Sequence, residues 1–181
     1  MDDLTAYKLR VAGQRRDLDK LIALFEGFKE YVDRLAEWIK GDLSDGSLRA
    51  AQERFALRIE PEAQRFTVWN DGEEMLHYEI FTLVREPQEC RNPTVFKDYV
   101  VRGTLKFQQL LEDAREELAT AREELAIIAG EDVAATVSPK PQETSTIEKV
   151  KVAEEVLDKS FTWGERIITI GSWVVRLFAM F

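Results

Sequence analysis

Apolar side chains recur at steps of three and four in two long segments, from Asp17 to Ile39 and from residue 107 to 128. This is the period of an α-helix with one apolar face, so each segment predicts a long helix. Gly41 is expected to end the first, whereas Asn92-Pro93 is expected to begin the second and Gly130 to end it. Stripes of this kind pack on each other within one chain or between two copies. They consist of Leu18, Leu21, Phe25, Phe28, Val32, Leu35 and Ile39, and of Phe107, Leu111, Ala114, Leu118, Ala121, Leu125 and Ile128.

Four other segments have the period of a β-strand. Residues 5–11 alternate in polarity and predict a short strand, and the segments 55–60, 65–69 and 75–84 predict three more. Asn70-Asp71-Gly72 between the last two is a strong hairpin signal. The expected fold class is therefore α+β and helix-rich, with the two long heptad-patterned helices packed on a small antiparallel β-meander.

The chain changes character over residues 132–146. This stretch holds two prolines and several Ser and Thr residues without any apolar period, which is typical of an extended linker. We therefore expect three parts: an α+β body at 1–131, a flexible linker at 132–146 and an amphipathic interaction helix at 147–181. Ser145-Thr146-Ile147-Glu148 fits a capping box that begins the last helix.

The C-terminal helix is expected to be the binding element. Its apolar face is wide, and a seam of heptad spacing carries Gly164 and Gly171 in its middle, where a second backbone is able to approach closely. Three surfaces are candidates for covering this apolar face: the body of the chain, a groove on a protein partner, and a membrane interface. The predicted partner-binding residues are Phe161, Trp163, Gly164, Ile167, Gly171, Trp173, Val174, Phe178 and Phe181.

Composition limits the class of partner. The net charge of −9 and the sequence pI of about 4.8 argue against a nucleic acid, since phosphate binding needs a surplus of Lys and Arg on one face. The N-terminus lacks the features of a secretory signal, and no apolar stretch reaches the length of a membrane span. With the single cysteine, these features predict a cytoplasmic protein.

The chain has few residues suited to catalysis. His77 is the only histidine and Cys90 the only cysteine, so a site with several histidine or thiolate metal ligands is not possible within one chain. A Cys90–His77 pair is the one nucleophile and base that the sequence offers, and nothing near Cys90 marks an oxyanion site. No nucleotide-binding or metalloprotease motif occurs. We expect no cofactor, no metal and no enzyme activity.

The leading hypothesis is a non-enzymatic adaptor, regulatory protein or small subunit that docks its C-terminal helix into a protein partner, or self-associates through it. The alternative is a membrane-perturbing effector, whose C-terminal helix the body keeps covered until linker cleavage or a partner releases it. An enzyme is the third and least favoured class.

Overall fold

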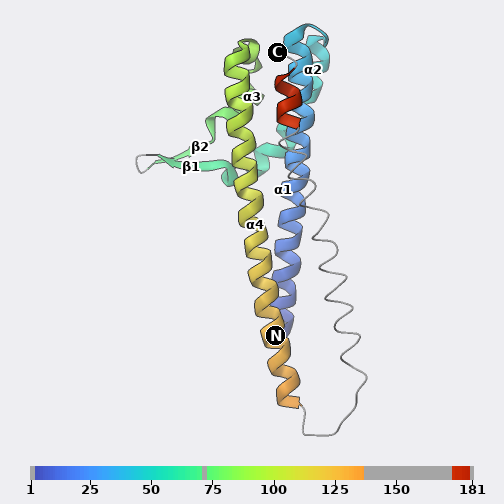
Figure 1. Ribbon diagram of the computed structural model, residues 1–181, viewed down its shortest axis with the longest axis vertical. Coiled ribbons are helices and arrows are strands. Elements are labelled where there is room, and N and C mark those ends of the chain that lie inside the picture. The colour runs from blue at the N-terminus through green and yellow to red at the C-terminus, as the bar shows by residue number, and fades with distance from the viewer. Residues whose placement is uncertain (1–2, 71–72, 137–172, 180–181) are drawn as a thin grey trace. The chain divides into compact units, whose positions relative to one another are not determined.

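The structure is a computed structural model that describes residues 3–70, 73–136 and 173–179. The chain divides into two compact units, Met1–Ile128 and Ala129–Phe181. Nearly all of the described residues belong to the first unit or to the long helix that leaves it (Figure 1).

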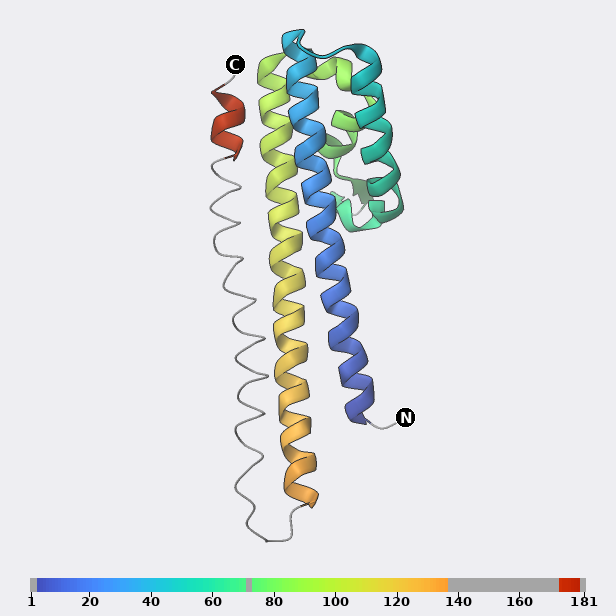
Figure 2. The ribbon, with the colours of Figure 1, turned by 90° about the vertical axis from the view of Figure 1, so that its right-hand side faces the viewer.

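Two long antiparallel helices form the axis of the first unit. α1 spans Asp3–Lys40 and α4 spans Pro93–Thr136, and the two run side by side in both views (Figures 1 and 2). An ion pair between Arg10 and Glu124 joins them far from the turn at Gly41. The predicted stripes meet here, with Phe28 and Phe107 fully buried.

Gly41 ends α1 as predicted. Its φ of 87° lies in the left-handed region, which glycine adopts without steric cost. Its N–H donates to the Trp38 carbonyl at 3.0 Å, and the Asp42 N–H donates to the Glu37 carbonyl at 2.9 Å. The last carbonyls of the helix are thereby satisfied.

The residues that separate α1 from α4 in the sequence form a small folded region, here called the head. It consists of α2 (Asp45–Ile59), η1 (Glu60–Phe66), β1 (Thr67–Asn70), β2 (Glu73–Leu76), α3 (Tyr78–Arg85) and η2 (Pro87–Arg91). The two strands pair antiparallel with Thr67 opposite Leu76, so the hairpin signal at 70–72 is confirmed. Figure 2 shows α2 on one side of the α1–α4 pair.

The expected α+β class is wrong, because the protein is helical and has a two-stranded hairpin in place of a β-meander. Residues 5–11 belong to α1 and residues 55–59 to α2, whereas the predicted strand at 75–84 divides into β2 and α3. In α3 the residues 80–84 are all buried. Five consecutive buried residues cover more than one helical turn, so this stretch shows no 3.6-residue period and resembles a buried strand. Residues 5–11 make a single short alternation that the longer helical period overrides.

The long helices also exceed their predicted bounds. α1 begins at Asp3 and not at Asp17, and α4 continues through Gly130 to Thr136. The glycine signal at 130 is therefore wrong as a helix end, because one glycine inside a helix costs only about 1 kcal/mol. The rest of the predicted linker, 137–146, and residues 147–172 of the predicted interaction helix lie outside the described residues. The proposed division into body, linker and interaction helix stays a prediction.

At Gly103 the backbone of α4 lies close to side chains of α1 and α3. A Cβ atom at this position would lie 3.0 Å from Cζ of Phe28 and 3.1 Å from Cγ1 of Ile80. Phe28 and Ile80 are both fully buried and come from α1 and α3. A Cβ atom at position 103 would therefore require Phe28 or Ile80 to shift by a few tenths of an ångström.

We predict that Gly103→Ala lowers the free energy of unfolding by about 1–2 kcal/mol. Overpacking a core costs about 1–3 kcal/mol, and the better helix propensity of alanine returns up to about 1 kcal/mol. Gly13→Ala in α1 is the matched control, because nothing lies within 4 Å of its Cβ position. It should raise the free energy by about 0.5–1 kcal/mol. Urea denaturation followed by circular dichroism measures both, and an equal gain in the two variants would contradict the close packing at Gly103.

Candidate functional site

The structure describes three of the nine predicted partner-binding residues. Trp173, Val174 and Phe178 lie in one helical stretch, residues 173–178, so the predicted helical conformation is present there. The other six, Phe161, Trp163, Gly164, Ile167, Gly171 and Phe181, lie outside the described residues.

This short helix has a buried side and an exposed side. Trp173 is 7% exposed and Leu177 2% exposed, whereas Val175 is 69% exposed. Trp173 and Leu177 are four residues apart and therefore share one side of the helix. Val174 and Phe178, which the heptad seam favours, are only half-buried. Leu177 is thus a residue that the sequence reasoning missed, and the signal was its spacing of four from Trp173.

Cys90 lies in η2 and is fully buried. Burial, and after it the charge of the neighbouring Glu89 carboxylate, raises the pKa of its thiol to about 12. At neutral pH the side chain is therefore a protonated thiol, which is a poor nucleophile. Its surroundings indicate a packing role in the core.

His77 lies at the junction between β2 and α3, where its backbone N–H donates to the Phe66 carbonyl at 2.6 Å. Its Nδ1 atom is 3.2 Å from Oε2 of Glu79, within ion-pair distance but without the geometry of a hydrogen bond. Partial burial lowers the pKa of the imidazole; Glu79 opposes this effect, and Lys106 and Arg102 add to it. His77 is consequently neutral near pH 7.

The Glu79 carboxylate also receives a charged hydrogen bond from α4. Nη1 of Arg102 donates to Oε1 of Glu79 at 3.0 Å, and Nε of Arg102 donates to Asp98 at 3.2 Å. Charge-assisted bonds of this kind fix the start of α3 against α4. The interactions given for His77 and for Cys90 do not join the two side chains, so the structure shows no contact between the nucleophile and base that the sequence offered.

A pair of tyrosines lies next to this cluster. The rings of Tyr78 and Tyr99 meet edge to face with centroids 5.8 Å apart, and Tyr78 is 58% exposed. A hydrogen bond with Tyr78 raises the pKa of the Tyr99 hydroxyl. The sequence gives no signal for this pair, because the residues come from different helices.

The described part of the first unit also has one small cleft between α1 and α2. It has a volume of about 40 Å³ and is lined by Gly27, Glu30, Tyr31, Ala51, Arg54, Phe55 and Arg58. A space of this size holds one or a few water molecules and no organic cofactor. Arg54 and Glu30 flank it with their charged groups 4.0 Å apart.

The described residues contain no group of three or more His, Cys, Asp or Glu side chains placed to hold a metal ion. No helix among them has the length and apolar character needed to cross a membrane. Comparison with protein-family models, with curated proteins and with solved structures gave no match. The functional proposals below therefore rest on the residues and their geometry.

We predict that His77 makes the protein less stable as the pH falls. Because the pKa of His77 is lower in the folded state than the ordinary value of about 6.5, the unfolded chain binds more protons just below that value. The stabilising contribution is complete above about pH 6.5 and is lost as the pH falls toward the folded pKa. Chemical denaturation at pH 7.5 and pH 5.5 should show a larger loss for the wild type than for His77→Gln. Equal losses in the two proteins would show that His77 does not titrate in this way.

Proposed function

We propose that the protein is a non-enzymatic adaptor, regulatory protein or small subunit that docks its C-terminal amphipathic helix into a protein partner. The observation that carries this proposal is the amphipathic helix at 173–178, whose Trp173 and Leu177 share one buried side. Because Trp173 and Leu177 are already covered within the chain, docking on a partner would exchange these intrachain contacts for contacts with the partner.

The first unit, by contrast, buries its phenylalanine side chains in its own core. Phe107 contacts Phe25, Phe28 and Phe66, with ring centroids 5.3, 5.1 and 4.9 Å apart. Its buried polar groups also hold secondary structure together: Tyr31 donates to the Leu83 carbonyl at 2.6 Å. These contacts support a scaffold role for the unit, with recognition assigned to the C-terminal segment.

A protein partner is favoured over a lipid surface by charge. Residues 161–181 carry one acidic side chain, Glu165, and two basic ones, Arg166 and Arg176. Each basic residue contributes only about 1 kcal/mol of attraction to an anionic membrane. Trp and Phe anchors of the kind present in this segment dominate the binding energy of many protein interfaces.

We predict that Trp173→Asp together with Leu177→Asp weakens partner binding by at least about thirtyfold, because buried aromatic anchors contribute about 2 kcal/mol or more. Val175→Asp is the matched control, since it places the same charge on the exposed side of the same helix. The partner is first captured from cell extract on the full chain and identified by mass spectrometry. Isothermal titration calorimetry then measures the affinity of the purified partner for the wild type, for the double variant and for Val175→Asp.

A partner that binds the double variant as tightly as the wild type would contradict the proposed anchors. Leakage of dye from liposomes at micromolar concentrations of the full chain would instead support the membrane-perturbing alternative. If no stoichiometric partner is found and the double variant abolishes the leakage, the membrane-perturbing alternative would replace the adaptor proposal.

A further inference from the structure

Arginine side chains of the chain cover two of its aromatic rings. The guanidinium carbon of Arg85 lies 5.1 Å from the centroid of the Phe81 ring, and that of Arg91 lies 4.6 Å from the centroid of the Trp38 ring. The π-face of an aromatic ring is negative and attracts a cation in this geometry. In these two places the chain supplies both the ring and the cation.

The tyrosine pair, Tyr78 and Tyr99, has the rings without the cation. Tyr78 is the first residue of α3 and Tyr99 lies in α4, and their ring planes meet at 90°. Tyr78 is 58% exposed, and Tyr99 is half-buried. Within the described part of the chain, no Lys or Arg side chain lies over either ring. The pair is therefore an aromatic surface that the chain leaves exposed.

Acidic side chains of three elements lie near the tyrosine pair. The hydrogen bond with Tyr78 is the main cause that raises the pKa of the Tyr99 hydroxyl, and the charge of Glu89 in η2 raises this pKa as well. Glu79 directly follows Tyr78 in α3, and Asp98 directly precedes Tyr99 in α4. A cation at the pair therefore meets negative charge in addition to the aromatic faces.

Arg102 does not neutralise all of this negative charge. Its side chain donates to Glu79 at 3.0 Å and to Asp98 at 3.2 Å, so one cation is shared by two carboxylates. Glu89 is exposed, and among the described residues no basic side chain forms an ion pair with it. Glu89 is therefore able to pair with a cation from another molecule.

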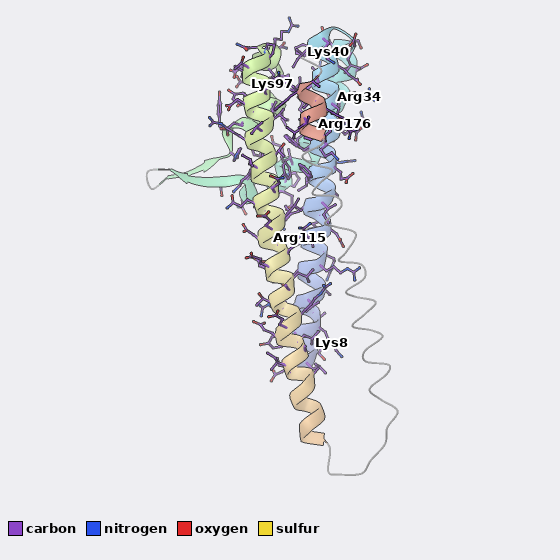
Figure 3. All side chains as sticks on the ribbon, in the orientation of Figure 1. Lys8, Arg34, Lys40, Lys97, Arg115 and Arg176 are labelled. Carbon is purple, nitrogen blue, oxygen red and sulfur yellow. The ribbon has the colours of Figure 1, made fainter. Side chains whose placement is uncertain are left out.

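The two lysines of α4 lie away from the rings. Figure 3 shows Lys97 on the upper part of this helix, but two residues correspond to about 200° around a helix, so Lys97 and Tyr99 lie on different sides. Lys106 follows Tyr99 by seven residues, which is about 10 Å along the helix, and its charge acts on His77. Neither lysine is therefore placed to cover the tyrosine rings.

We propose that the tyrosine pair binds a basic side chain of a partner protein, either a lysine ammonium or an arginine guanidinium, over the exposed face of Tyr78. The ring attracts the cation as Phe81 and Trp38 attract their arginines, and the Glu89 carboxylate supplies the opposite charge. The net charge of −9 also favours the approach of a basic partner. This inference is independent of the proposed function, because it concerns residues outside the C-terminal segment.

A small organic cation fits this surface less well. Sites for small molecules enclose most of the ligand, usually about 70–90% of its surface. The tyrosine pair offers two rings, one of which belongs to a residue that is 58% exposed, so it would leave such a cation largely in water. A protein partner covers the cation with the rest of its own surface, which excludes water and strengthens the cation–π contact.

The test uses the full chain with 3-fluorotyrosine at its four tyrosine positions, and a short peptide of alternating Lys and Gly. Fluorine NMR gives a signal for each tyrosine, which single substitutions by Phe assign. The signals of Tyr78 and Tyr99 should shift saturably as the peptide is added, because the cation lies against these rings. The signals of Tyr7 in α1 and of the buried Tyr31 should not move. The same peptide with Gln in place of Lys should shift none of them.

Two substitutions at Tyr78 separate the aromatic ring from its hydroxyl. Tyr78→Leu should weaken binding of the Lys peptide, followed by the Tyr99 signal, by about three- to tenfold, because it removes the π-face. Tyr78→Phe keeps the ring and should bind within about twofold of the wild type. Tyr7→Leu is the matched control, since it makes the same change at a half-buried tyrosine of α1, and it should bind as the wild type does. Circular dichroism checks that each variant is folded.

Absence of any shift at millimolar concentrations of the Lys peptide would overturn the inference. Equal binding of the peptide by folded Tyr78→Leu and by the wild type would also overturn it, because charge alone would then attract the peptide. Tighter binding of tetramethylammonium than of the Lys peptide would assign the tyrosine pair to a small organic cation instead.

Discussion

The close approach of the α4 backbone at Gly103 to side chains of α1 and α3 constrains the packing of the core of the first unit. With a side chain at this position, Phe28 and Ile80 would have to move by a few tenths of an ångström. Both side chains are fully buried in a closely packed core, so such a movement would disturb the residues around them. The absence of a side chain places the Phe28 ring against Phe107, one turn further along α4. Phe107 in turn contacts Phe66 at the end of η1. One glycine thus lets a single aromatic cluster join both long helices to the head.

Specific polar contacts then fix the head on this cluster. Tyr31 of α1 and Gln52 of α2 donate to the carbonyls of Leu83 and Val84, at 2.6 and 2.5 Å, near the end of α3. At the turn after α1, the Trp38 indole N–H donates to Asp45 at 2.6 Å. These contacts join elements that are distant in sequence, and they satisfy polar groups that burial would otherwise penalise. The polar side chains that make these hydrogen bonds therefore stabilise the fold of the head.

Sequence reasoning succeeded where a single period continues over many residues. The stripes of Phe25 and Phe28, and of Phe107 and Leu111, predicted two helices that pack along their length, and Gly41 predicted where the first one ends. Residues 80–84 could not be read in the same way, because a short segment buried on every side has no polar face to reveal its period. The role of Gly103 could not be predicted from the sequence, since it depends on Phe28 and Ile80, which are distant in sequence. The tyrosine pair and the Glu79–Arg102 contact likewise depend on the tertiary fold. For the C-terminal segment, the pattern placed Trp173 and Phe178 on a helix but did not single out Leu177.

The central claim is that the first unit has a complete core of its own, so that the C-terminal segment is able to leave its intrachain contacts for a partner without loss of the fold. The most direct test compares thermal unfolding and light scattering of the full chain with those of a version truncated after Glu143. We predict that the truncated protein remains monomeric and unfolds cooperatively, with a midpoint within about 4 °C of the full chain, which corresponds to a difference of about 1 kcal/mol. A truncated protein that aggregates or is largely unfolded at room temperature would contradict this claim, because the C-terminal segment would then be required for the stability of the fold.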